Sequence, residues 1–268
     1  MRQITGLFLL LALLVPLNAY GRTAETGPRP EGLELGYRLI HFNYEESLME
    51  EEGWMNGIFA GYTHRAESGL MLSAEVEYFY GELDYDGQYQ NGTPLETDTD
   101  DHLFQVRGLI GWDFFLRGWT ITPYAGLGWR YWNDQIHAVG GYEREIRYFY
   151  APFGFEFLNS PAPAWLIGFT AEYDLFLDGQ ADANFSDIGP GYEDASMDQN
   201  FGEGYGVRFS VAATYAFEKF SLNFEPFFRY WDIEESDTDA AAVPNGTAVW
   251  VEPENETTIY GFGLSIGF

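Results

Sequence analysis

Residues 260–268 read Tyr260-Gly261-Phe262-Gly263-Leu264-Ser265-Ile266-Gly267-Phe268, a strict alternation of large apolar residues with glycine or serine. Successive side chains of a β-strand point to opposite faces of the sheet, so this stretch predicts a strand with one apolar and one small or polar face. The period of two recurs along the chain, whereas helical periodicity is scarce. The sequence therefore predicts an all-β fold.

Nine further segments complete the predicted set of ten strands. They span residues 33–39, 55–64, 72–80, 104–114, 121–131, 149–157, 167–175, 205–215 and 220–230. In the segment 55–64, Gly57 and Gly61 leave the assignment of its two faces open. A soluble sandwich would show the same alternation, so the connections must distinguish the two architectures.

The connections alternate between short and long. The short ones are residues 65–69, 116–119, 158–164 and 216–219, and the long ones are 44–53, 82–101, 133–145, 177–204 and 232–257. This rhythm is typical of a transmembrane barrel with short periplasmic turns and long external loops. We therefore expect a single up-and-down antiparallel transmembrane β-barrel of ten strands, because a closed barrel satisfies every backbone hydrogen bond in lipid.

The charge distribution supports this assignment. The chain of 268 residues has a formal net charge of −29, and the five long connections hold 30 of its 42 acidic residues and a single base, Arg144. The short turns and the N-terminal segment hold five bases, Arg22, Arg29, Arg65, Arg117 and Lys219. Such acidity argues against nucleic acid as a partner. The absence of cysteine excludes disulfides, thiolate zinc sites and a cysteine nucleophile.

The first residues indicate export. Met1 and Arg2 precede an apolar run from Ile4 to Pro16, and small residues follow. This pattern predicts a signal peptide over residues 1–21. A periplasmic segment over residues 22–31 and the barrel domain over residues 32–268 complete the predicted organisation.

The alternating segment 260–268, which ends on the aromatic Phe268, resembles the C-terminal assembly signal of bacterial outer-membrane barrels. The resemblance implies secretion by the general route, insertion by the barrel-assembly machinery, and residence at the cell surface of a Gram-negative bacterium. The surroundings would then be outer-membrane lipid and lipopolysaccharide. These barrels include pores, adhesins and enzymes, so this resemblance leaves the function open.

Ten strands with five external loops resemble the omptin proteases and the ten-stranded adhesin barrels. Omptins carry one Asp pair and one Asp–His pair at the barrel mouth, and Asp84 and Asp86 could match the first pair. The four histidines are His41, His64, His102 and His137, and none lies in the fourth or fifth long connection. Without a histidine to activate water, the omptin mechanism lacks its base, so we expect no enzymatic activity and no catalytic residues.

Charged residues are predicted on the inner wall. The acids are Glu34, Glu75, Glu77, Asp113, Glu156, Glu172, Asp174 and Glu225, and the bases are Arg38, Arg107, Arg130, Arg208 and Arg229. In a narrow barrel these side chains should meet and pair into a structural core. The alternative is a narrow cation-preferring channel, in which Gly126, Gly128, Gly261 and Gly263 leave space for water.

The acidic loops suggest a surface role. Asp98, Asp100 and Asp101, or Asp178 and Asp182, could coordinate divalent cations, but no run matches a calcium-binding loop. We therefore predict no metal-binding residues, no cofactor-binding residues and no cofactor. The expected role is non-enzymatic and surface-exposed, structural or interactive, with cations or a surface ligand at the acidic loops. The alternatives are the narrow channel and, last, an omptin-like surface hydrolase.

Overall fold

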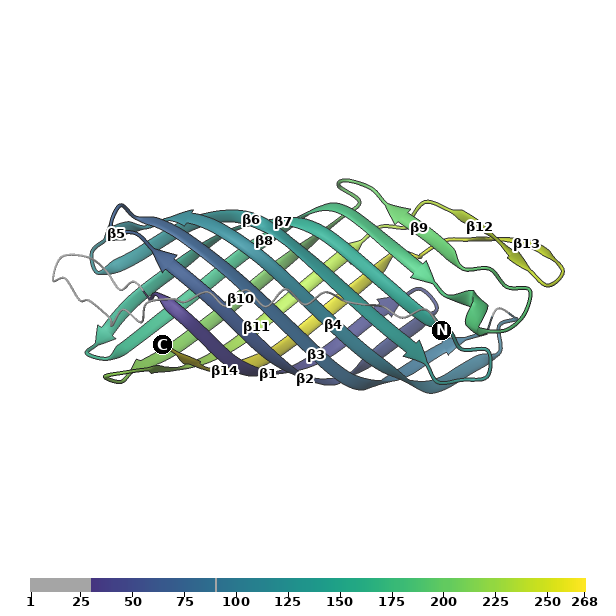
Figure 1. The fold of residues 1–268 in the computed structure, drawn as a ribbon, viewed down its shortest axis with the longest axis horizontal. Coiled ribbons are helices and arrows are strands. Elements are labelled where there is room, and N and C mark those ends of the chain that lie inside the picture. Colours follow the sequence, from purple (N-terminus) through teal and green to yellow (C-terminus); the bar gives the residue numbers. More distant parts are fainter. Residues whose placement is uncertain (1–29, 90) are drawn as a thin grey trace, which may run out of the picture.

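The structure, a computed structural model, describes residues 30–89 and 91–268 and is an elongated β-barrel (Figure 1). Of the twelve strands that form its main sheet in this part of the chain, ten make up the wall and two, β5 and β9, are additions to it. The wall strands are β1 (Gly32–Glu46), β2 (Met49–Arg65), β3 (Leu70–Gln88), β4 (Pro94–Trp112), β6 (Trp119–Ile136), β7 (Glu143–Ala162), β8 (Trp165–Ala183), β10 (Gly204–Ala216), β11 (Ser221–Ile233) and β14 (Asn255–Gly267).

The barrel is closed by its first and last strands. Strand β1 pairs antiparallel with β14, with Leu35 opposite Ile266 and Phe42 opposite Ile259. Every other wall strand pairs antiparallel with its sequence neighbours in the wall. The predicted ten-stranded, up-and-down antiparallel topology is therefore confirmed, and no wall strand presents an unpaired edge to lipid.

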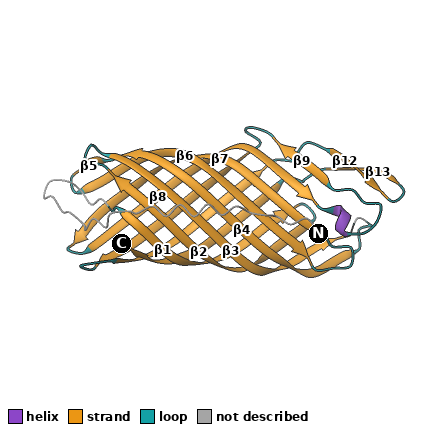
Figure 2. Ribbon diagram, in the orientation of Figure 1, coloured by secondary structure: helices purple, strands orange, loops and turns teal. Residues whose placement is uncertain are grey.

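Small elements decorate the two ends. At the end with the short turns, β5 (Phe114–Leu116) pairs with β6. At the other end, β9 (Ala195–Gln199) pairs with β8, η1 (Phe185–Asp187) is a single 3-10 turn, and β12 (Asp239–Val243) with β13 (Gly246–Trp250) forms a separate hairpin (Figure 2). Within the described residues, no helix is long and apolar enough to cross a membrane.

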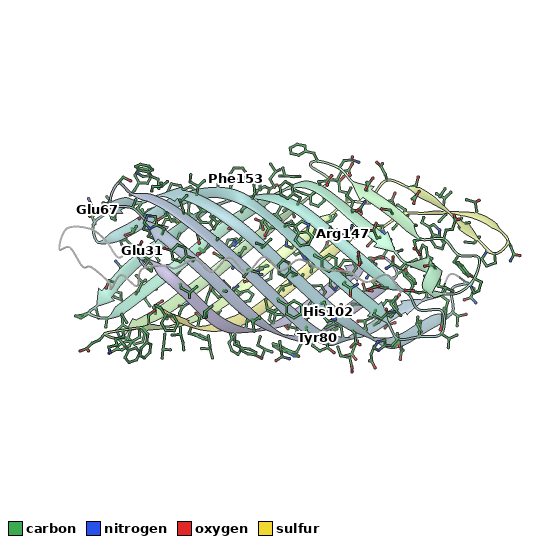
Figure 3. All side chains as sticks on the ribbon, viewed as in Figure 1. Glu31, Glu67, Tyr80, His102, Arg147 and Phe153 are labelled. Atoms are coloured by element: carbon green, nitrogen blue, oxygen red, sulfur yellow. The ribbon has the colours of Figure 1, made fainter. Side chains whose placement is uncertain are left out.

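Alternation along the wall strands separates two chemistries. On β3, Leu72, Val76 and Tyr78 point outward, whereas Glu75 and Glu77 point inward. The ambiguous segment of β2 follows the same rule, because Ile58 is 65% exposed on the outer face and Met55 is fully buried inside. The outward-facing apolar side chains therefore form an apolar belt around the outer wall (Figure 3).

Aromatic residues mark both edges of that belt. Tyr and Trp side chains stand exposed at its two margins, as membrane interfaces favour. Near the short turns they are Trp112, Trp119, Trp165 and Tyr215, and at the opposite margin they are Trp54, Tyr80, Tyr173 and Tyr260. The girdles thus delimit the part of the barrel that spans the membrane.

The strands continue well beyond the belt, which corrects the predicted long loops. The first long connection, 44–53, is reduced to the two-residue turn of Ser47 and Leu48, and the second, 82–101, is reduced to residues 89–93. The alternation persists there, but the outward residues change from apolar to acidic: Glu82, Asp84 and Asp86 point outward on β3 while Leu83 is buried. We call this projecting part, residues 43–53, 81–101, 133–147, 177–204 and 232–257, the acidic extension.

Candidate functional site: the lumen and the acidic extension

The lower lumen, toward the short turns, is crossed by ion pairs. Arg107 on β4 binds Glu75 on β3 at 2.8 Å and Glu172 on β8 at 2.7 Å, and Tyr124 donates a hydrogen bond to Glu172. Glu77 on β3 accepts from both Arg38 on β1 and Arg229 on β11. Glu75 and Arg107 lie on adjacent strands, whereas the Arg107–Glu172 and Arg229–Glu77 pairs join strands that are not neighbours and therefore cross the lumen as charged rungs.

All thirteen charged residues predicted on the inner wall lie on the inner face of the barrel. The predicted pairing holds for nine of them, whereas Glu34, Asp174, Arg130 and Arg208 form no ion pair with a described residue. The sequence interpretation also missed Arg65, which it placed in a short turn. Arg65 is the last residue of β2, and its guanidinium binds Asp113 at 2.6 Å and also Glu156. Arg65 is an odd number of residues from its outward-facing neighbours, like the inward-facing Met55 and Phe59 on the same strand. This alternation could have placed Arg65 inside the barrel.

The lumen glycines do not leave space for water, which corrects the sequence expectation. A Cβ atom at Gly128 would lie 2.2 Å from the ring of Tyr150 on the adjacent strand β7. At Gly126 and Gly261 it would lie within 2.2 Å of a neighbouring backbone oxygen, and at Gly263 it would meet the stem of Arg38. These glycines therefore accommodate close neighbours rather than water.

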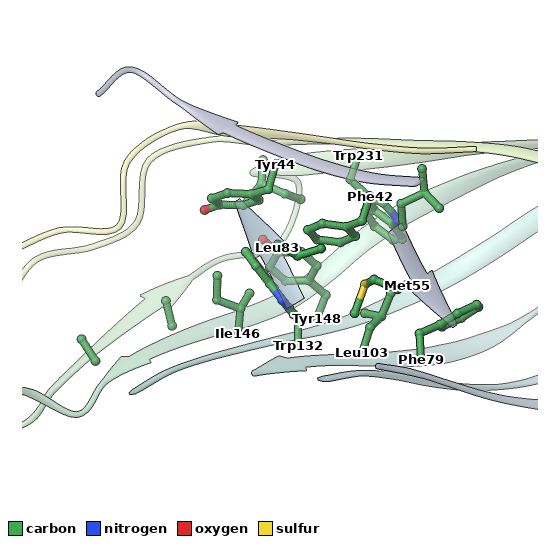
Figure 4. Packing of buried hydrophobic residues seen from close by; sticks show 14 of the residues in the cluster. Phe42, Tyr44, Met55, Phe79, Leu83, Leu103, Trp132, Ile146, Tyr148 and Trp231 are labelled. Carbon is green, nitrogen blue, oxygen red and sulfur yellow. The ribbon is translucent and has the colours of Figure 1, made fainter. Parts of the chain in front are cut away.

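The upper lumen is filled by a hydrophobic core that the sequence interpretation did not foresee. Phe42, Phe79, Leu103, Trp132 and Tyr148 are each 2% exposed or less and come from five different wall strands (Figure 4). The prediction of a polar lumen is therefore right for the lower half of the barrel and wrong for the upper half.

Arg130 lies within this hydrophobic core. Its guanidinium carbon is 5.5 Å from the ring centre of Tyr148 and 5.8 Å from that of Trp231. Two of its nitrogen atoms, Nε and one terminal nitrogen, have no hydrogen-bond partner. Aromatic faces, rather than a carboxylate, balance this buried charge.

Above the core, one arginine gathers four carboxylates, and we call this group the Arg144 cluster. Arg144 on β7 binds Glu46 at 2.8 Å, Asp134 at 2.8 Å, Glu51 at 3.4 Å and Glu252 at 3.6 Å. Glu252 precedes β14, so the cluster ties the last long connection to β1, β2 and β6. The hydroxyl oxygen of Tyr44 lies 2.9 Å from a carboxylate oxygen of both Glu46 and Glu252 and can donate its single proton to either.

Burial and mutual repulsion raise the pKa of the acids in this region. Burial first, and then the nearby Glu46, raise the pKa of Glu252 to about 7. Burial and the adjacent Asp134 raise the pKa of Asp101 to about 7, although Thr99 and Trp132 donate hydrogen bonds to its carboxylate. The pKa of Glu51 is also raised well above its usual range, chiefly by burial. A single guanidinium cannot neutralise so many acids, so some of these carboxylates carry a proton near neutral pH.

The outer surface of the acidic extension carries few bases. Arg147 binds Glu145 and also Asp182, the latter at 2.7 Å. Of the acids considered as cation ligands, Asp101 points inward, whereas Asp100 points outward and lies 3.2 Å from His137. Strand alternation thus separates them, and no group of three acids or histidines among the described residues has the geometry to hold a metal ion.

The proposed omptin-like acid pair faces away from the lumen. Asp84 and Asp86 are exposed on the outer wall of β3, opposite Asp98 and Glu96 on β4. Among the described residues, no histidine contacts either one: His102 contacts Tyr78, and His137 contacts Asp100. The two carboxylates therefore lack the partner that would activate water.

Comparison with known proteins agrees with this geometry. Residues 32–141, from β1 through β6, match the family described as the autotransporter beta-domain. The outer membrane protease OmpT from Escherichia coli superposes with a TM-score of 0.57 at 10% identity, over 90% of this chain and 98% of that one. The chain is a bacterial outer-membrane β-barrel protein. At this identity the likeness to OmpT extends to the fold alone.

Other outer-membrane barrels superpose less well. The transport unit of the autotransporter AIDA-I from Escherichia coli covers 90% of this barrel with a TM-score of 0.39 at 8% identity and 91% of its own chain. Neisserial surface protein A covers 90% of this barrel and all of its own chain, with a TM-score of 0.37 at 15% identity. A search of curated protein sequences found no match. The predicted signal peptide, residues 1–21, and most of the predicted segment 22–31 lie outside the described residues.

Proposed function

We propose that this barrel is a non-conducting, non-enzymatic cell-surface protein whose acidic extension binds a positively charged partner. The observation that carries the proposal is the filled lumen, which leaves the projecting end as the part able to act. We expect outer-membrane lipid and lipopolysaccharide around its apolar belt and the barrel-assembly machinery as a partner during biogenesis.

The lumen is obstructed at two levels. Ion-paired side chains from non-neighbouring strands cross its lower half, and Phe42, Phe79 and Trp132, each buried to 1% exposure or less, fill its upper half. An aromatic core packed like that of the upper half excludes water. An ion would have to displace both layers to pass, which argues against the channel alternative.

The acidic extension has the charge to attract a cationic partner. Most of its exposed acids, including Asp84, Asp86, Glu96 and Asp98 on the β3–β4 hairpin, make no ion pair with a described residue. Clustered charge of one sign raises the local concentration of oppositely charged ligands and accelerates their association. A basic protein surface fits this chemistry best, because no rigid metal site is present among the described residues.

Planar-bilayer recording of the refolded barrel tests the first half of the proposal. We expect no conductance steps from preparations whose gel mobility shifts on boiling, which shows that the barrel is folded. Reproducible cation-selective steps that diminish in Glu75→Gln or Glu172→Gln would instead establish the channel.

Binding of oligolysine to the refolded barrel tests the second half. We expect salt-sensitive binding that weakens when Asp84, Asp86, Glu96 and Asp98 are replaced together by Asn and Gln. The matched control replaces Glu67 and Glu218, in the short turns of the opposite end, by Gln and should bind normally. Equal binding by both variants would reject the assignment to the extension. If the parent barrel hydrolyses peptides and the Asp84→Asn variant does not, the hydrolase alternative would be restored.

A further inference from the structure

A cavity opens in the lower lumen, toward the short turns. Its volume is about 190 Å³, and its wall includes Glu34, Arg38, Thr170, Arg208, Ser210 and Asn223. One water molecule requires roughly 10–15 Å³ of such volume, so the cavity has room for several waters or a small organic molecule. It lies at the opposite end from the acidic extension and plays no part in the function proposed above.

Most charges around this cavity are already neutralised. Arg38 binds Glu225 at 2.9 Å, Arg107 binds Glu75 at 2.8 Å, and Arg65 binds Glu156. These groups have partners of opposite sign on the wall. They therefore shape the cavity without being free to receive a charged ligand.

Arg208 is different. It is 5% exposed, it forms no ion pair with any described residue, and its Nε has no hydrogen-bond partner. A buried guanidinium with unused donors is costly unless something accepts its hydrogen bonds. Its planar fork of donors matches a carboxylate, which can accept two parallel hydrogen bonds.

Glu34 is the complementary group. Its carboxylate accepts hydrogen bonds from Ser265 and, at 3.1 Å, from Asn223, and both of these donors are neutral. Within the part of the chain that the structure describes, no base binds it directly. The cavity wall therefore carries one cation and one anion that form no direct ion pair with a described residue, and hydroxyl groups of Thr170 and Ser210 also line it.

We propose that this cavity binds a small zwitterion of the amino-acid type, with the carboxylate on Arg208 and the ammonium group on Glu34. The ligand supplies each of these two residues with a partner of opposite charge. The obstructed upper lumen means that it is held from the short-turn end and not passed through the barrel.

Saturation-transfer NMR of the refolded barrel with L-alanine, acetate and methylammonium tests the proposal. We expect saturable binding of L-alanine and weaker binding of either half-ligand. Arg208→Gln and Glu34→Gln should each weaken L-alanine binding by about tenfold or more, as expected for loss of a charge-assisted contact. Matched controls are Arg117→Gln and Glu67→Gln, both in exposed turns outside the cavity lining, which should bind as the parent does.

The wild-type ligand series decides the question even if a variant fails to fold. Acetate binding as tightly as L-alanine would mean a simple anion site and overturn the zwitterion proposal. The absence of saturable L-alanine binding to a heat-modifiable barrel would also overturn it. Neither outcome affects oligolysine binding or conductance, so failure here is distinguishable from failure of the proposed surface function.

Discussion

At the scale of single residues, Arg144 is the most consequential charge in the extension. It is 6% exposed and contacts four carboxylates from separate segments. Removing one partner from a buried ionic group typically costs about 3–5 kcal/mol, so we expect Arg144→Gln to destabilise the extension by roughly this amount. Denaturant unfolding followed by tryptophan fluorescence would measure it. The control is Arg147→Gln on the half-exposed outer wall, which should cost less than about 1 kcal/mol.

Two glycines offer a matched test of packing between strands. A Cβ atom at Gly128 would lie 2.2 Å from the Tyr150 ring, whereas one at Gly108 would meet nothing within 4 Å. We expect Gly128→Ala to cost about 1–3 kcal/mol through overpacking, and Gly108→Ala to stay within about 0.5 kcal/mol of the parent. Unfolding midpoints in urea would compare them. Equal effects would contradict the close packing of Tyr150 over Gly128.

At the scale of elements, the β12–β13 hairpin is paired in a sheet of its own, outside the barrel wall. Asp239 pairs with Trp250 at its base, and Trp250 packs on Phe185 with ring centres 4.1 Å apart. Because the paired ends are adjacent, an Asn-Gly turn can replace residues 240–249. We expect the shortened chain to keep its heat-dependent gel mobility and, since residues 240–249 contain no charge, its oligolysine binding. Loss of oligolysine binding would move the proposed interaction to the hairpin.

The face of the strand that each residue occupies was predictable from sequence, but the length of the strands was not. The alternation of Leu72 and Val76 with Glu75 and Glu77 assigns the two faces of β3 correctly. Beyond Tyr80 the outward side chains become Glu82 and Asp84 while Leu83 points inward, so the apolar residues change from the outer to the inner face although the strand continues. The wall strands therefore extend farther than an analysis based on lipid-facing residues can detect.

At the scale of the whole molecule, pH should control how firmly the extension closes over the lumen. The pKa of Asp101 rises from 3.8 to about 7 and that of Glu252 from 4.5 to about 7, so the folded state holds protons that the unfolded state releases. Their contribution to stability is therefore full below about pH 4 and lost as the pH rises through about 7. Hydrogen exchange at residues 43–53 and 251–257 should be slower at pH 5 than at pH 8, after correction for intrinsic exchange. Asp101→Asn should reduce this difference.

The chemistry of the lumen was only partly predictable, because it depends on contacts between strands that are distant in sequence. Sequence parity places Phe79 and Tyr124 on the inner face, but a strand pattern does not reveal which inner residues meet across the barrel. Phe79 joins an aromatic core, whereas Tyr124 binds Glu172 in the ionic layer. The unpaired state of Arg208 likewise depends on strands far apart in sequence. Only the closed geometry distinguishes it from Arg107.

The seam between β1 and β14 determines the order in which the molecule can fold. Arg38 on the first strand meets Glu225, 187 positions later, and the wall cannot close until β14 lies beside β1. Contacts so distant in sequence make folding slow, because the chain must lose much of its freedom before they form. Until then the pairs Arg38–Glu225 and Arg229–Glu77, which join the two ends of the chain, cannot form, so we expect closure to be a late, cooperative event.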